Sequence, residues 1–391
     1  MAEPGGRWRR GLWIAPGDGA DHITGLPLEL RARIASFLPF RQVVQLSSLS
    51  RPWRRIHYHT PVVRVKLSDF LFPTGEMLAL DEEHAFAGLE AALLRRAEEP
   101  GSGSSKVKAL EIRYSVHEPL MRHHADRIIA LADARELRIE IFINGRRDSS
   151  AAWALDLPPS TRALDVVAFG HLAPTISGPG AAALENLGFH IGVVREWSRL
   201  PSLRILTLEL VTVQAPFPLG ACWPLLEDLS RSWTSPSSRR SWKRSSSVVA
   251  PELETLVVRC GRGHEDYRSF TLQAPRLRCL EWYNQFTERV DIDVGRPGSV
   301  TAGVIELVWN GGRDMKDRRA LMMRMLKGLL PELPQEQLAD AARPHITHDK
   351  YYKVHCHGEL VLEEKITCDL DALMSPLQLA SLNDLQNQVQ N

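Results

Sequence analysis

Histidine and cysteine side chains that could bind a metal ion gather at His355, Cys356, His357 and Cys368. Imidazole nitrogens and thiolate sulfurs are the ligands that zinc prefers in proteins. Residues two apart share one face of a strand, so His355 and His357 would point to one side while Cys356 points to the other. No Cys-x-x-Cys or His-x-x-x-His pair accompanies them. We therefore expect a structural histidine pair on a strand, with no metal and no cofactor.

The other paired histidines and the common catalytic motifs give no enzyme site. His57 and His59 flank a tyrosine, and His123 adjoins His124, so the members of each pair diverge on a helix. The chain has no His-Glu-x-x-His zinc motif, no Gly-x-Ser-x-Gly nucleophile turn, no phosphate-binding loop and no kinase signature. The sequence therefore predicts a protein without catalytic residues, whose elements serve binding.

Bulk composition is that of an ordinary soluble protein. The chain has 391 residues, enough for two or three domains or one elongated array, and 44% of them are hydrophobic and 24% charged. A formal net charge of +1 gives no overall attraction to nucleic acid or to an anionic membrane. No apolar run reaches the roughly 18 residues of a membrane helix, so we expect no membrane partner.

Cysteine content and the first residues indicate the compartment. Five cysteines without paired spacing argue against a disulfide framework. The basic start is followed by Gly, Pro and Asp instead of an apolar stretch, so a signal peptide is not expected. Both features favour the cytoplasm or the nucleus.

Three short helices are predicted near the N-terminus, between residues 26 and 58. Apolar residues recur at helical spacing from Leu26 to Leu38, and Pro27 suits a first helical turn. Pro39 ends this helix, and a second helix carries Val43, Val44, Leu46 and Leu49. Ser50 is a candidate cap for a third helix through Trp53, Ile56 and Tyr58. A unit of about forty residues cannot bury this much apolar surface alone, so a partner or a following domain must cover part of it.

This pattern resembles the F-box, the adaptor-docking module of SCF-type ubiquitin ligases, over residues 21–60. The resemblance implies that the module binds a Skp-family adaptor, which links it to cullin and RING subunits, and that the chain itself is not catalytic. The residues that the resemblance assigns to the adaptor contact are Leu26, Pro27, Leu30, Ile34, Phe37, Leu38, Pro39, Val43, Val44, Leu46 and Trp53. The alternative is an ordinary helical subdomain whose apolar face packs on its own protein.

A repeated phrase, apolar-x-x-Leu-x-apolar, fills the middle of the chain. Its anchors are Leu110, Leu137, Leu164, Leu187, Leu206, Leu229, Leu256, Leu280 and Leu307. The spacings of 19 to 27 residues agree with the roughly 20–29 of leucine-rich repeats. A proline stands five residues before five of the anchors, where it would turn the chain into a short strand. Alternation then places apolar residues on one face of a stacked parallel sheet and polar residues on the other.

The combination resembles plant F-box/leucine-rich-repeat proteins of the grass type. The expected fold class is α/β: a three-helix F-box, then an irregular leucine-rich-repeat solenoid with a curved parallel sheet, then a C-terminal cap of helix and strand. The alternative is a mixed α/β domain in which leucines fall near strands by chance.

Elements around the repeats complete the predicted organisation. Helices are expected over 82–98, 124–134 and 315–330, and strands over 137–143 and 358–366. Residues 230–247, SRSWTSPSSRRSWKRSSS, read as a mobile basic loop that could contact nucleic acid or an importin, although a solvated loop is the simpler interpretation. The expected segments are a flexible N-terminus (1–20), the F-box (21–60), a linking strand and helix (61–106), the repeats (107–314), a cap (315–382) and a tail (383–391).

The function that these predictions favour is substrate recognition. The F-box would dock the adaptor, and the polar sheet face would bind a target protein whose identity the sequence does not reveal. A non-degradative scaffold, in which the helices only cap the repeats, is the alternative. Nucleic acid is not expected as a partner.

Overall fold

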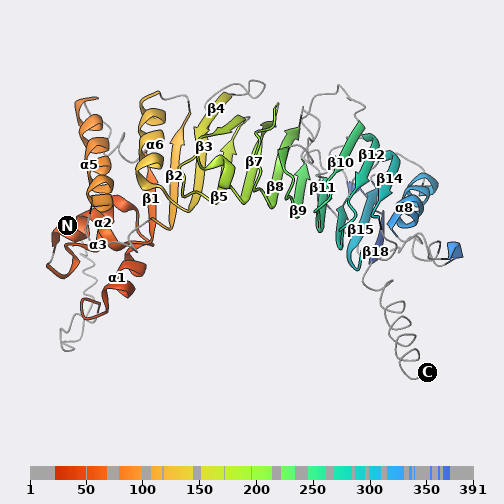
Figure 1. Cartoon of the computed structure of the whole chain (residues 1–391), viewed down its shortest axis with the longest axis horizontal. Helices are drawn as coiled ribbons and strands as arrows, with labels where there is room; N and C mark the ends of the chain where they lie inside the picture. Colours follow the sequence, from red (N-terminus) through yellow and green to blue (C-terminus); the bar gives the residue numbers. More distant parts are fainter. Residues whose placement is uncertain are drawn as a thin grey trace, which may run out of the picture.

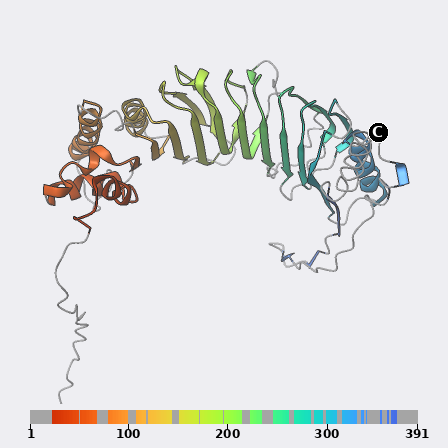
Figure 2. The ribbon, with the colours of Figure 1, turned by 60° about the horizontal axis from the view of Figure 1, so that its bottom comes forward.

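The main feature of the computed structural model is one long β-sheet, and the N-terminal helices pack at its first strand (Figure 1). The structure describes residues 23–49, 51–67, 79–98, 107–116, 119–143, 151–170, 172–194, 196–213, 222–233, 245–260, 267–283, 287–295, 299–309, 315–329, 334–336, 339, 353–354, 360–361 and 364–369. Figure 2 shows the sheet as a continuous band that runs from the N-terminal helices towards α8.

The N-terminal helices follow the predicted order with shorter bounds. Helix α1 covers Leu28–Ala35 and α2 covers Phe40–Leu49, on either side of Pro39. The predicted third helix is two pieces, the 3-10 turn η1 (Arg51–Trp53) and α3 (Ile56–His59). The chain departs from helical geometry between them, because Arg55 has φ −108° and ψ 6°. The predicted cap Ser50 lies outside the described residues.

Within the described residues the long sheet has eleven strands, and all neighbours pair in parallel except the last two. In spatial order the strands are β1 (Val62–Lys66), β2 (Ala109–Ser115), β3 (Glu136–Phe142), β5 (Ala163–Phe169), β7 (Asn186–Val194), β8 (Ile205–Val213), β9 (Asp228–Trp233), β11 (Thr255–Cys260), β13 (Cys279–Tyr283), β15 (Ala302–Trp309) and β18 (Glu364–Asp369). Parallel neighbours need a return segment between them.

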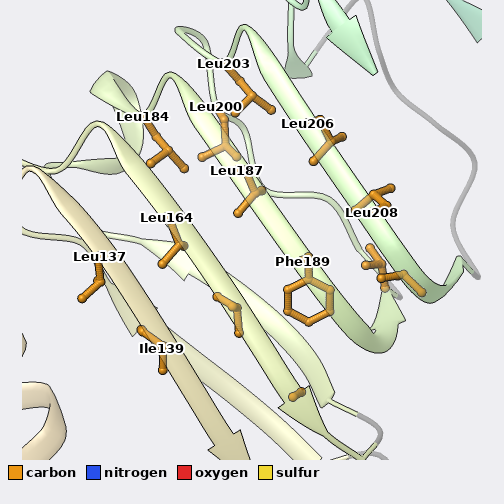
Figure 3. Close-up of a cluster of buried hydrophobic side chains, with 14 of the residues drawn as sticks. Leu137, Ile139, Leu164, Leu184, Leu187, Phe189, Leu200, Leu203, Leu206 and Leu208 are labelled. Carbon is orange, nitrogen blue, oxygen red and sulfur yellow. The ribbon is translucent and has the colours of Figure 1, made fainter. Parts of the chain in front are cut away.

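Eight of the nine predicted anchors form one ladder across this sheet. The leucines in register are Leu110, Leu137, Leu164, Leu187, Leu206, Leu229, Leu256 and Leu280. All eight are buried, and Figure 3 shows four of them pointing to one side of neighbouring strands. Burial alternates along the strands, so the intervening residues form an open face. Leucine at the same position of eight successive strands therefore gives the sheet a continuous core.

The ninth anchor was wrong, because Gly303 and not Leu307 stands opposite Leu280. Leu307 lies four residues further along β15, opposite Ile366 of β18. Gly303 has φ +125°, and a Cβ built there would lie 2.1 Å from the Leu280 carbonyl oxygen. The backbones approach too closely for a side chain at this position, so glycine replaces the leucine that the repeat pattern requires.

The prolines before the strands occupy β-turns. The amide of Leu203 donates to the carbonyl of Leu200 across Pro201, and Leu277 donates to Ala274 across Pro275 in the same way. Proline suits the second position of such a turn because its φ is fixed near −65°. The leucine that closes each of these two turns is buried, so the turn also fills the core.

Helices and short strands cover the outer side of the sheet (Figure 1). The helices are α5 (Ala79–Glu98) and α6 (Pro119–Ala132) near the first strands and α8 (Met315–Leu329) near the last ones. Between them lie the pair β4 (Ala151–Asp156) and β6 (Leu172–Ser177), the turn η2 (Ala181–Ala183), and the sheet of β10 (Ser245–Val249), β12 (Tyr267–Gln273) and β14 (Thr287–Asp293). The three helices were predicted, whereas none of these five outer strands was.

Three further predictions need new bounds. The expected loop 230–247 overlaps two strands, since β9 continues to Trp233 and β10 begins at Ser245, and residues 234–244 lie outside the described part. The expected strand 358–366 is divided into β17 (Leu360–Val361), which pairs with β16 (Lys353–Val354), and β18. The segments 1–20 and 383–391 and the candidate ligands His355, Cys356 and His357 also lie outside the described residues.

Candidate interaction surfaces

An exposed apolar strip runs along the first helix. Leu30 is 47% exposed, Ile34 is 43% exposed and Phe37, just after the end of α1, is 73% exposed. Their spacing of four and three residues puts them on one side of the helix. Ile23, before the helix, is exposed as well. We call these four residues the α1 strip, and their clustering makes the strip a candidate docking surface.

The other predicted adaptor contacts divide into three groups. Pro27 and Pro39 are exposed, and Leu26, Leu38, Val44, Leu46 and Trp53 are half-buried. Val43 is 1% exposed and belongs to the core of the helical unit, so it was wrongly assigned to the surface. It packs inward with Ala32, Ala35, Phe40 and Ile56. The sequence pattern could not separate these inward residues from the strip, because both are apolar at helical spacing.

Two arginines fasten the helical unit to its neighbours, one from helix α5 and one from the sheet. The buried Arg96 of α5 donates to the carbonyl of His57 at 3.0 Å and to the hydroxyl of Thr60 at 3.2 Å, and burial lowers its pKa to about 10. Arg64 of β1 donates to the carbonyl of Ser36 and pairs with Glu111 of β2 at 2.7 Å. Charged side chains bonded to backbone carbonyls hold the unit in one orientation on the first strands.

Charged side chains of both signs line the open face over the first strands. Arg64 faces Glu111 in register, and Arg138 lies 3.8 Å from Asp165. Glu140 lies 3.7 Å from Arg113 and 3.9 Å from Arg138. The last two distances are too long for hydrogen bonds, whereas the Arg64–Glu111 pair is hydrogen-bonded. The open face therefore carries both hydrogen-bonded ion pairs and ion pairs whose charged groups lie too far apart for a hydrogen bond.

His190 joins three neighbouring strands of the open face. Its Nε2 lies 2.8 Å from Asp165 of β5, and its Nδ1 lies 2.9 Å from Glu209 of β8. The hydrogen bond to Asp165 is the main cause that raises the pKa of His190, burial opposes it, and Glu209 adds to the rise. The protonated imidazole can donate to both carboxylates at once. Asp165, His190 and Glu209 thus form a hydrogen-bonded charged cluster across three strands, which we call the clamp.

Two phenylalanines interrupt the polar character of the open face. Phe142 of β3 and Phe169 of β5 are in register and stack with ring centroids 4.9 Å apart. The guanidinium of Arg113 lies 4.2 Å from the Phe142 centroid, and Phe169 is 47% exposed. The sequence predicts a polar face and gives no aromatic residues on it. The signal that could have found the two rings is their place at the positions of the strands that alternate with the buried ones.

The described residues offer little to a metal or a membrane. Among them, no group of three His, Cys, Asp or Glu side chains could hold a metal ion. Within the same residues, no helix is both long and apolar enough to span a membrane.

The helical unit is similar in sequence to a known domain family. The family model for the F-box domain matches residues 23–56. An FBD-associated F-box protein of Arabidopsis thaliana is 25% identical over 302 residues, which is 76% of this chain and 59% of that protein. An F-box protein of the same plant is 41% identical over 54 residues, 14% of this chain and 13% of that protein. The chain thus spans less than two thirds of the relatives it matches, and no solved structure matches it.

These matches and the structure confirm the predicted fold class at a coarse level. An F-box of short helices stands near the N-terminus, and a parallel β-solenoid with mixed α/β structure follows it. The similarity is to plant F-box proteins, and the α1 strip lies inside the matched region.

Proposed function

We propose that this protein is the substrate-recognition subunit of an SCF-type ubiquitin ligase. The F-box would bind a Skp-family adaptor and through it the cullin and RING subunits, and the solenoid, as a leucine-rich-repeat array, would bind a target protein. The chain supplies no catalytic residue in this proposal, because its contribution is to hold the target near the conjugating enzyme.

One observation carries the proposal: the α1 strip is exposed within the residues that match the F-box. Leu30, Ile34 and Phe37 stay in water in the isolated chain, and covering them would release their apolar surface from solvent. A few large apolar side chains gathered at one site are the usual anchors of a stable protein interface. Placement in the cytoplasm or nucleus is part of the proposal, since that is where the adaptor would be met.

Adaptor capture by the full chain tests the proposal. Ile34→Asp should abolish capture of the Skp-family adaptor and leave the unfolding midpoint nearly unchanged, because the side chain is already in contact with water. Leu120→Asp is the matched control, since Leu120 is also 43% exposed but lies on α6, outside the F-box.

The assignment of the adaptor contact to the α1 strip fails if both variants capture the adaptor as the unmodified protein does. A chain that folds but never captures the adaptor would instead support the alternative, a non-degradative scaffold whose helices cap the solenoid.

A further inference from the structure

A shallow groove lies where the F-box meets the first strands of the open face. Its volume is about 180 Å³, and Pro39 of the turn between α1 and α2 forms part of its wall. The charged residues that line it are Arg64, Lys66, Arg113, Arg138, Glu111 and Glu140. Four cations and two carboxylates leave an excess of two positive charges, so the groove favours a partner with negative charge.

Two of the arginines are incompletely paired inside the protein. The Nε of Arg113 is buried and has no hydrogen-bond partner, and its nearest carboxylate oxygen, on Glu140, lies 3.7 Å away. Arg138 approaches Glu140 and Asp165 no closer than 3.8 Å. A buried donor without a partner is destabilising. The Arg113 side chain as a whole is 40% exposed, so its guanidinium can reorient towards an incoming carboxylate. The loose ion pairs lose little when they rearrange, because exposed pairs contribute about 0–1 kcal/mol.

The stacked rings continue this groove on the same face. Arg113 stands opposite Glu140 on β3, Phe142 follows Glu140 by two residues, and Phe169 stands opposite Phe142 on β5. Two strand spacings and one two-residue step separate Arg113 from Phe169, a distance of about 12 Å. An extended peptide covers that distance in three or four residues.

We propose that this groove binds an acidic segment of the target protein, in which Asp or Glu precedes or follows a large apolar residue by three or four positions. The acidic side chains meet Arg113 and Arg138, and the apolar side chain packs on the exposed ring of Phe169. Glu111 and Glu140 stand between the cations, so the groove suits separate carboxylates better than a nucleic-acid backbone, in which every unit is charged.

This inference deepens the proposed function, because it rests on the open sheet face being the target-binding surface. It also accounts for the position of the groove beside Pro39: a segment bound there lies next to the F-box and therefore next to the proposed adaptor.

Binding of short labelled peptides to the full chain tests the inference. The first probe is a twelve-residue peptide of Gly and Ser with Asp residues at three and at four positions before a single Phe. The second replaces both Asp residues by Asn, and the third replaces the Phe by Ala. Fluorescence anisotropy should give at least a tenfold tighter binding of the first probe than of either other probe, and this affinity should fall as salt is added.

Substitutions in the groove locate the binding. Arg113→Glu with Arg138→Glu should weaken the first probe at least tenfold, and Phe169→Ala should reduce its affinity to that of the Ala probe. Arg113→Gln with Arg138→Gln is a milder version that adds no repulsion to Glu140 and guards against misfolding. The matched control, Arg204→Glu with Arg276→Glu, reverses two exposed charges outside the groove, which pair with Glu227 and Glu252, and should change nothing.

Three outcomes overturn the inference: no binding of the first probe, equal binding of the Asp and Asn probes, or equal binding by the folded Gln variant. Adaptor capture is measured on the same samples without any peptide. Intact capture with failed peptide binding removes the groove assignment alone, whereas failed capture by the unmodified chain removes the proposed function.

Discussion

Truncation of Phe37 separates docking from folding in the F-box. Phe37 is 73% exposed, which for a phenylalanine of ~200 Å² leaves ~150 Å² in water. Covering that area with a partner at ~25 cal/mol per Å² would contribute at most ~3.5 kcal/mol to binding. Alanine keeps part of the contact, so we expect Phe37→Ala to weaken adaptor binding by about 2–3 kcal/mol, or about 30- to 150-fold.

The stability of the chain should barely respond to the same change. The guanidinium of Arg64 lies 6.0 Å from the Phe37 centroid, and an exposed contact of this kind contributes ~0.5–1 kcal/mol. Phe40 is the matched control, because it is 2% exposed and lies in the core of the helical unit. Phe40→Ala should lower the free energy of unfolding by ~3–5 kcal/mol.

Isothermal titration with the adaptor and urea unfolding give the two readouts. The reasoning is refuted if Phe37→Ala binds the adaptor within threefold of the unmodified chain, since the α1 strip would then not be the contact. It is equally refuted if Phe37→Ala destabilises the chain as much as Phe40→Ala does, because Phe37 would then serve the fold.

Three further changes test the solenoid. Gly303→Ala forces a Cβ into the backbone of β13 and should lower the free energy of unfolding by ~2–4 kcal/mol, whereas Gly88→Ala, in open space on α5, should raise it slightly in the same urea titration. Trp153→Phe removes the buried 2.8 Å hydrogen bond to the hydroxyl of Tyr114 and should lower the urea midpoint by the equivalent of ~1–3 kcal/mol, whereas equal midpoints would contradict this. The pKa of His190 is raised in the folded chain, so its contribution is fully present below the unfolded pKa of about 6.5 and is lost as pH rises through the folded value. His190→Gln should therefore destabilise the chain at pH 6 and change little at pH 9, and an equal loss at both pH values would contradict the clamp.

The strands of the main sheet could be predicted from the sequence wherever the same residue type occupies the same structural position in successive strands. Eight anchors are leucines because the same buried register position recurs from strand to strand, and a turn proline precedes several of these strands. At the end of the array this regularity fails. Gly303 takes the ladder position because two backbones touch there, and no local pattern distinguishes it from Leu307, which belongs to a better copy of the phrase.

The outer strands could not be predicted because they lack the repeated leucine phrase, although their partners are no more distant along the chain than those of the main sheet. Strand β10 begins in a basic, serine-rich stretch without apolar alternation, and it pairs with β12 twenty-four residues later, Ser245 with Ser269. The register of β10 is set by its pairing with β12, a tertiary contact that the local sequence of β10 does not encode. The inward position of Val43 has the same origin, since only the packing of α2 against α3 and β1 decides which apolar face is buried.

Rigid attachment of the F-box gives the two surfaces a common geometry. A buried arginine is expensive to keep charged, and Arg96 offsets part of that cost by donating to two acceptors at the edge of α3. Arg64 bonds the same joint from the sheet side, so rotation of the F-box would break the hydrogen bonds that both arginines donate to it. The α1 strip and the groove beside Pro39 therefore keep a fixed distance and orientation to each other. A receptor that must present its target to a distant enzyme needs such a joint, because a flexible one would lower the effective concentration of the target at the reaction site.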